Sequence, residues 1–573
     1  MDDVFETTHG AVRGFRAADD VVAALGIPYA APPFGADRFR APRPAPPWSG
    51  VRDGTAFGPV APQSAELPGA PSWRPGDEDV LTVNVWTPAP AAGRLPVLVW
   101  IHGGAYTFGS SAQPDFDGTA LARTGLVVVT LNYRLGFEGF GHVPAGSDTD
   151  APVPVGVDVD SGAGAGAGAG VYVSVCGDAD FDPYVSAGAH SDAATDSDAA
   201  TDPDAATDSD AATDPDGAAP PDNRGLLDLI AALRWIRDEI GAFGGDPGNV
   251  TLAGQSSGAT AVVCLMVMEQ ARGLFRRAIA HSPASPFHTR GIAASTTREI
   301  AAAAGCEATP AGLASVTPQA LVAASDQVVD AYRRDPASGS RHNDPSLFAP
   351  VLGGATLPVD PLTALAEGAA RGVDLLLCHT TEEYWLLDAV GSCAKLTTDA
   401  QLDRFAADFG LDGDLVEGYR SARSGAPVPD VHLALFGDLL FGEFTHRLAE
   451  AHAAGGGRAH LSVFDRRRGG ADRTAVRAWH CADIPFAFGN LDDDRLSFLV
   501  GGAPGPEDHE LAHRMVRAWS DFAATGAPGW APVADTTRRT AHVWTTVDQP
   551  ATDRRPLPDR ALWATTDFPL LRP

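Results

Sequence analysis

Short apolar runs alternate with longer stretches of helical periodicity through most of this chain. The runs at residues 97–101 and 126–131 are almost wholly apolar, which is typical of strands buried on both faces of a mainly parallel sheet. From 226 to 240, apolar side chains recur at three- and four-residue intervals. This spacing predicts a helix that Gly241 or Gly244 can end.

A second unit of the same kind follows directly. Residues 249–253 have the pattern of a strand, a glycine-rich turn comes next, and an apolar helical stretch starts at Ala259. Strands that alternate with helices predict an α/β architecture. With 573 residues, 44% of them hydrophobic, the chain is long enough to bury a large core.

The segment 147–222 departs from this pattern. It contains no Lys, Arg or Glu and seventeen Asp; a Gly-Ala alternation at 161–170 precedes four copies of the hexapeptide S/P-D-A-A-T-D, the first starting at Ser191. Such a composition buries too little apolar surface to offset the entropy of ordering, so we predict a disordered insert. Calcium binding is the alternative for Asp-rich repeats, but this hexapeptide lacks glycines for tight turns. The predicted organisation is one α/β domain in two parts, 1–146 and 223–573, with the insert between them.

Charge and cysteine usage narrow the function classes. The formal net charge is -31, which argues against nucleic acid or an anionic membrane as a partner. The start of the chain lacks a secretory signal pattern, and no apolar run approaches the roughly 20 residues of a membrane span. The six cysteines show no metal-ligand spacing. We therefore expect a cytoplasmic protein with reduced thiols, although Cys378 and Cys393 are a conceivable pair in an exported chain.

The glycine-rich turn carries the first candidate chemistry. It reads Gly254-Gln255-Ser256-Ser257-Gly258, the G-x-S-x-G pattern of a nucleophile elbow between a strand and a helix. In such an elbow, the residues that flank the serine have little or no side chain, which permits a strained turn that exposes the serine hydroxyl. The helix N-terminus behind it favours the negative charge that develops during attack. A purely structural turn is the alternative interpretation.

A second glycine-rich motif follows the strand predicted at 97–101. It reads His102-Gly103-Gly104-Ala105, and small residues there allow backbone N–H groups to approach a tetrahedral intermediate. The N–H groups of Gly104, Ala105 and Ser257 are candidates for a three-donor oxyanion hole.

Several further motifs are specific in combination. They are Gly26-Ile27-Pro28-Tyr29-Ala30 with Arg38-Phe39, Glu78-Asp79-Val80-Leu81-Thr82-Val83-Asn84-Val85-Trp86, Asn132-Tyr133-Arg134-Leu135-Gly136, Ala242-Phe243-Gly244-Gly245-Asp246-Pro247, and Trp519, Phe522-Ala523, Thr525-Gly526 and Pro528. Together they resemble the type-B carboxylesterase family, which includes para-nitrobenzyl esterases and cholinesterases. The resemblance runs nearly end to end outside the acidic segment, and it implies the α/β-hydrolase fold.

The resemblance also implies a triad in the order Ser, acid, His. The segment from Trp479 to Asn490 resembles the family's histidine segment, which makes His480 the general base. Thr380-Thr381-Glu382-Glu383 resembles the segment that ends in the orienting carboxylate, which makes Glu383 the acid and leaves Glu382 as a solvated neighbour. His379 precedes the acid in the chain and does not fit the order.

Three positions depart from the family pattern: Gln255, Ser257 and Val80. Ser257 keeps its backbone N–H, which is all that the oxyanion hole needs. Gln255 replaces the usual glutamate of the elbow and keeps hydrogen-bonding capacity without the charge, so we expect it to tune the site. Val80 replaces a cysteine, so the disulfide of the family's secreted members is absent. Asp438 matches a recurrent family aspartate, for which we expect a supporting role.

The resemblance thus implies hydrolysis of carboxylic esters through an acyl-Ser256 intermediate, with no metal and no organic cofactor. The expected partner is a small-molecule ester; the same triad serves lactones, amides and carbamates. A non-catalytic binding protein of the cholinesterase-like adhesion type is the alternative from another class, but such proteins lack triad residues that are all present here. The sequence leaves open the acyl and alcohol preference, the physiological substrate and the oligomeric state.

Overall fold

The computed structural model describes residues 3–64, 72–88, 93–144, 219–469, 476–533, 540–546, 554–556 and 559–570. The predicted disorder of the acidic insert therefore concerns residues that lie, apart from 219–222, outside the described part of the chain. The four exceptions include Asp222, which is buried.

One large sheet organises the described residues. Its eleven strands lie in the order β16 (Arg554–Pro556), β15 (Thr540–Trp544), β14 (Ala459–Phe464), β13 (Asp374–Thr380), β10 (Arg277–His281), β9 (Gly245–Gln255), β7 (Leu95–Ile101), β8 (Val127–Leu131), β6 (Thr82–Pro88), β4 (Val21–Pro28) and β3 (Phe15–Ala18). Neighbours from β15 to β8 pair in parallel, whereas β16 and the β6–β4–β3 end pair antiparallel. The predicted α/β-hydrolase fold, with its mainly parallel sheet, is confirmed.

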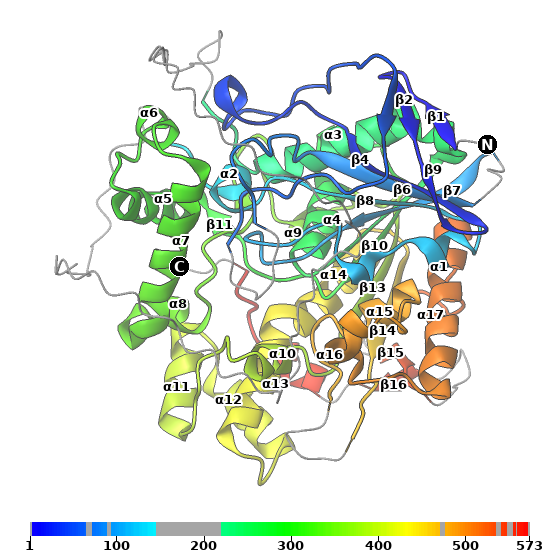
Figure 1. Cartoon of the computed structure of the whole chain (residues 1–573). Helices are drawn as coiled ribbons and strands as arrows, with labels where there is room; N and C mark the ends of the chain where they lie inside the picture. Colours follow the sequence, from blue (N-terminus) through cyan, green and yellow to red (C-terminus); the bar gives the residue numbers. More distant parts are fainter. Residues whose placement is uncertain are drawn as a thin grey trace.

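Helices cover this sheet and extend beyond one end of it (Figure 1). They are α1 (Thr119–Ala122), α2 (Gly136–Phe140), α3 (Arg224–Glu239), α4 (Ser257–Val267), α5 (Arg290–Ala304), α6 (Pro310–Ala314), α7 (Pro318–Arg334), α8 (Ser340–Asn343), α9 (Pro361–Ala366), α10 (Trp385–Ala389), α11 (Asp399–Asp408), α12 (Gly413–Ala422), α13 (Val428–Gly437), α14 (Glu443–Ala454), α15 (Ile484–Phe488), α16 (Ser497–Val500) and α17 (Pro506–Thr525). None of the described helices combines the length and apolar character needed to cross a membrane.

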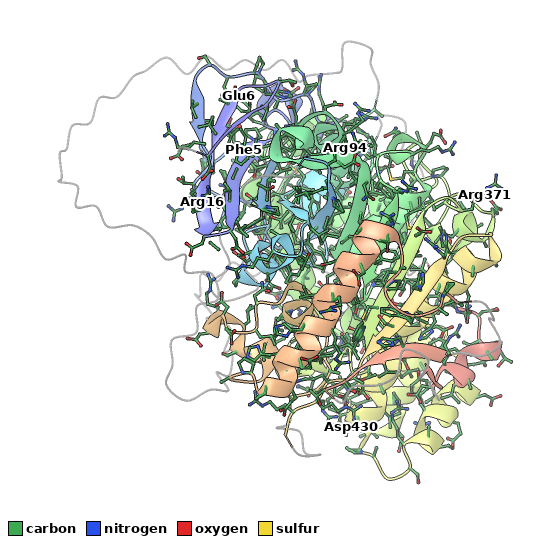
Figure 2. The ribbon with its side chains drawn as sticks, turned by 90° about the vertical axis from the view of Figure 1, so that its right-hand side faces the viewer. Phe5, Glu6, Arg16, Arg94, Arg371 and Asp430 are labelled. Carbon is green, nitrogen blue, oxygen red and sulfur yellow. The ribbon has the colours of Figure 1, made fainter. Side chains whose placement is uncertain are left out.

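Strand β7 shows why the sequence has continuous apolar runs. Its side chains alternate between two cores, because successive residues of a strand point to opposite faces. Val99 and Ile101 pack with residues of α3 and α4, whereas Leu98 and Trp100 pack with residues of α15 and α17. Figure 2 shows α17 as the long orange helix in front of the strands. Both faces of the sheet are therefore covered, and both sets of side chains must be apolar.

The predicted elements are present, with shifted ends. Strand β9 extends beyond 249–253 on both sides, and the helix predicted at 226–240 corresponds to α3. A 3-10 turn, Ile240–Phe243, follows α3, and Gly244 ends it with a φ of 83°. Phe243 packs against a separate small sheet, because its ring stacks on that of Phe5 in β1 (Val4–Glu6), with the two centroids 4.6 Å apart. That sheet also contains β2 (Ala11–Arg13) and β5 (Val51–Asp53), and a two-stranded sheet joins β11 (His288–Thr289) to β12 (Val351–Leu352).

Candidate active site

Ser256 stands in a strained turn between β9 and α4. Its φ is 57° and its ψ is -126°, a conformation that L-residues rarely adopt and that costs energy unless the surroundings enforce it. The turn is tied to the next strand, because the Ser256 N–H donates to the carbonyl of His281 at 2.8 Å. The first N–H groups of α4 lack intrahelical partners and lie directly after the serine. The geometry is that of the predicted nucleophile elbow.

The two glycines of the elbow are required by space. A Cβ at Gly254 would lie 2.6 Å from the carbonyl oxygen of Gly258, and one at Gly258 would lie 2.3 Å from that of Ile101. Both distances are far below an ordinary contact, so any side chain would push β9, α4 and the end of β7 apart. This close packing keeps the elbow beside the loop that follows β7.

That loop, His102–Ala105, contains two of the N–H groups that we predict for an oxyanion hole. Gly104 has a φ of 116° and Ala105 a φ of 51°, and a Cβ at Gly104 would lie 1.8 Å from the Phe108 carbonyl oxygen. Within the described residues, the N–H groups of Gly104 and Ala105 donate to no acceptor. The buried His102 ring stacks on the Tyr133 ring, with the two centroids 4.7 Å apart. Burial lowers the pKa of His102 to about 4.

Glu383 and His480 meet although 97 residues separate them. His480 Nδ1 lies 2.5 Å from Glu383 Oε2, and the backbone N–H of His480 donates to the Glu383 carbonyl at 3.1 Å. The other carboxylate oxygen accepts from Ser282 Oγ at 2.6 Å and from the Thr380 N–H at 2.7 Å. Both side chains are almost wholly buried. Three hydrogen-bond donors thus hold the carboxylate in one orientation against the imidazole.

Glu382 points away from this pair. It is not the solvated neighbour we expected, since it is ion-paired with Arg477 at 2.5 Å and Arg467 at 3.0 Å. His379 also turns away: its Nδ1 lies 2.9 Å from the Thr380 carbonyl and its Nε2 lies 3.0 Å from His446 Nε2. Both side chains line a polar cavity of about 470 Å³ whose lining includes neither Ser256 nor His480.

The remaining nitrogen of His480 has an unexpected partner. Its Nε2 lies 2.9 Å from the amide nitrogen of Gln255. Ser256 Oγ makes no hydrogen bond to any described residue, and its side chain is partly open to solvent. The structure therefore places Ser256 near His480 and Glu383, but the serine hydroxyl and the imidazole form no hydrogen bond.

Residues 1–152 and 213–554 match the carboxylesterase family. The chain belongs to this family. It is 32% identical over 550 residues to the para-nitrobenzyl esterase of Bacillus subtilis (strain 168), covering 94% of each chain. It is 31% identical to the fumonisin B1 esterase of Sphingopyxis macrogoltabida, over 92% of this chain and 82% of the other. Its fold matches a carboxylesterase of Geobacillus stearothermophilus with a TM-score of 0.72 and 31% identity, over 98% of this chain and 99% of that one. The protein is a serine carboxylesterase that hydrolyses carboxylic esters, as the sequence predicted.

Ser282 is a residue of this carboxylesterase site that sequence reasoning missed. It follows β10 directly, has a φ of 48°, and donates its hydroxyl to Glu383. Its N–H donates to the carbonyl of Cys378 at 2.7 Å, so the turn is held between two neighbouring strands. The available signal was its position at the carboxyl end of a parallel strand, where ligands and catalytic groups of open α/β sheets gather.

A buried cluster behind the esterase elbow has the residue types of a metal site. Ligand atoms of His281, Cys378 and Asp483 lie within 4.8 Å of one another. However, the Trp519 indole N–H donates to His281 Nε2 at 2.8 Å, and His281 Nδ1 lies 2.7 Å from Asp483 Oδ2. Nε2 must then be unprotonated and Nδ1 must carry the proton that it donates to the carboxylate. The position that a metal would need is occupied by this hydrogen bond.

Asp438 begins a π-helical turn, Asp438–Gly442, between α13 and α14 of the esterase. Tyr419 donates its hydroxyl to the Asp438 carboxylate, while the ring of Phe441, on the same turn, packs against the His480 ring at 4.3 Å. Burial, reinforced by the nearby Asp559, raises the pKa of Asp438 to about 7. The expected supporting role of this aspartate remains a prediction.

We predict that Asp438→Asn stabilises the enzyme more at pH 8 than at pH 4. An acid whose pKa is raised on folding holds a proton that the unfolded chain has released, so stability falls as pH rises from about 4 to about 7. Asparagine removes this penalty and keeps an oxygen for Tyr419, for a gain on the order of 2 kcal/mol at pH 8. Denaturant unfolding at both pH values measures it, with the exposed Asp521→Asn as control. Equal effects of Asp438→Asn at the two pH values would contradict the prediction.

Proposed function

We propose that Ser256 is the nucleophile, His480 the general acid/base and Glu383 the carboxylate that orients it. The observation that carries this assignment is the 2.5 Å contact between His480 Nδ1 and Glu383 Oε2, because it turns the second ring nitrogen toward the elbow. A carboxylate in this position selects the productive tautomer and stabilises the imidazolium that forms.

The first half-reaction transfers the acyl group to the enzyme. Ser256 Oγ bonds to the ester carbonyl carbon, its proton passes to His480 Nε2, and the carbonyl oxygen becomes an oxyanion. The N–H groups of Gly104, Ala105 and Ser257 are proposed to bind that oxygen, since the first two have no acceptor among the described residues and the third opens α4. The carbon–oxygen bond to the alcohol then breaks, and His480 returns the proton to the leaving oxygen.

The second half-reaction regenerates the serine. Water attacks the acyl-Ser256 carbonyl, its proton passes to His480, and the second tetrahedral intermediate collapses to the acid as Ser256 regains its proton. The substrate proposed is a small-molecule ester. Neither half-reaction requires a metal or an organic cofactor.

Labelling with a fluorophosphonate, followed by peptide mapping, tests the assignment. The probe forms a phosphorus–oxygen bond to an activated serine as fluoride leaves. We expect a single label on the peptide that contains Ser256, together with turnover of para-nitrophenyl esters that varies with acyl length. A label on another serine, or none, would contradict the proposal.

We also propose a cytoplasmic location. Five cysteines fall in the described residues, at positions 264, 306, 378, 393 and 481, and all five are free thiols. Burial raises the pKa of Cys264 and Cys378 above the usual thiol value, which keeps these groups in the less reactive protonated form. Free, unreactive thiols suit a reducing compartment.

The acidic segment is proposed to be dispensable for catalysis. The family match omits residues 153–212, and the chain on its two sides is held together, because His142 Nδ1 lies 2.7 Å from Asp222 Oδ1 and Arg290 binds the same carboxylate. A short Gly-Ser bridge from Gly146 to Ala219 should therefore keep esterase activity.

Shortening this connection about fivefold should also raise the free energy of unfolding by about 1.4 kcal/mol, since loop-closure entropy depends only logarithmically on length. Para-nitrophenyl ester turnover and the thermal midpoint measure the two effects. Loss of activity in a folded protein would instead assign the segment a part in shaping the entrance to the site.

A further inference from the structure

The Gln255 side chain lies between the turn that contains Ser256 and the imidazole of His480. It is the last residue of β9, it is 5% exposed, and its amide nitrogen lies 2.9 Å from His480 Nε2. Its amide oxygen lies on the other side, over Gly103, where a Cβ would be only 2.5 Å away. The absence of a side chain at Gly103 thus leaves the room in which the Gln255 amide lies beside the imidazole.

The tautomer of His480 decides the direction of this contact. Nδ1 faces a carboxylate, which only accepts, so Nδ1 carries the proton and Nε2 of the neutral ring presents its lone pair. The amide N–H of Gln255 donates to that lone pair. The oxygen of a reversed amide would face the same lone pair and repel it, and would be favourable only toward an imidazolium.

We propose that Gln255 is a positioning residue that competes with Ser256 for the base of the free enzyme. The lone pair that Gln255 occupies is the one that must accept the serine proton, and Ser256 Oγ makes no hydrogen bond to a described residue in the same structure. Engagement of the catalytic pair therefore requires the amide to release Nε2 and the serine hydroxyl to replace it. This inference rests on the proposed roles of Ser256 and His480.

The proposal predicts that Gln255→Met accelerates fluorophosphonate labelling of the free enzyme. Methionine keeps the length of the side chain and removes the competing donor. A neutral hydrogen bond corresponds to a factor of about five in an equilibrium, so we expect labelling about fivefold faster at low probe concentration. Gln401→Met, an exposed position on α11, is the matched control and should label at the parent rate.

A second variant supplies an independent readout. Gln255→Glu places an acceptor-only carboxylate at Nε2, which favours the imidazolium and withdraws the base. The acid limb of the kcat/KM profile should move to higher pH by about one unit. Glu383 binds His480, and the next residue in the chain, Cys481, interacts with Asp483, Asp115 and the Gln255 side chain. Both variants leave Glu383, Cys481, Asp483 and Asp115 in place.

The outcomes separate this inference from the proposed function. Labelling of Gln255→Met at the parent rate or below it, or a Gln255→Glu profile that superimposes on the parent, would overturn the competition while Ser256 stays the labelled residue. Labelling of a Ser256→Ala variant would instead overturn the proposed function. Circular dichroism verifies that each variant is folded. If Gln255→Met does not fold, the pH profile of Gln255→Glu tests the competition by itself.

Discussion

Replacing Ser256 with alanine should lower ester turnover on the order of 10⁶-fold, because the variant has no oxygen to form the acyl intermediate. The fold should be unaffected: the φ of 57° is imposed by the packing of Gly254 and Gly258, and alanine tolerates it about as well as serine. We therefore expect the thermal midpoint to stay within about 2 °C of the parent. Steady-state kinetics with para-nitrophenyl acetate and a thermal scan measure the two quantities.

Ser325→Ala is a matched control for this experiment. Ser325 is a buried residue of α7, and its hydroxyl donates only to the Leu321 carbonyl of its own helix. Removal of this hydroxyl should leave turnover unchanged within twofold, because it does not contact Ser256, His480 or Glu383. Residual activity of Ser256→Ala within tenfold of the parent would show that another residue is the nucleophile.

Glu383→Gln should reduce turnover by roughly 10⁴-fold, the cost expected when the orienting carboxylate of a triad loses its charge. One oxygen of Glu383 already accepts from Ser282 and Thr380. The other oxygen faces His480 Nδ1 at 2.5 Å. In the glutamine variant, an NH₂ group at this position would face the N–H of the imidazole, donor against donor. An NH₂ group at the first position would instead disturb the hydrogen bonds from Ser282 and Thr380. The imidazolium also loses its counter-charge. kcat/KM for a short-chain ester measures the effect.

Glu382→Gln is the control that tests the register. Its carboxylate binds Arg477 and Arg467 and does not contact the imidazole. Its loss should cost stability, about 1–3 kcal/mol for partly buried donors that lose their acceptor, with turnover within tenfold of the parent. If Glu382→Gln were the inactive variant and Glu383→Gln the active one, the carboxylates would be assigned in the wrong order.

The sequence alone determined the sheet and the elbow, because both depend on local rules. Continuous apolar runs required strands covered on both faces, and β7 and β8 have such faces. Small residues at Gly254, Gly258 and Gly104 were sufficient to predict close backbone approach, and each position lacks room for a side chain. The family motifs supplied the order of the triad, which periodicity does not contain.

Only the tertiary structure decided which polar atoms meet. Glu382 and Glu383 are adjacent residues of the same type. Only the conformation of the turn after β13 directs the Glu382 side chain to arginines and the Glu383 side chain to His480. The hydrogen bonds of the site join residues that are 101 to 238 positions apart in the chain. They are those of Ser282 to Glu383, of Trp519 to His281, and of Gln255 to His480. A hydrogen bond requires heavy atoms within about 3 Å in a narrow range of angles. That requirement is met by the packing of distant strands and helices, and no local pattern of the chain encodes it.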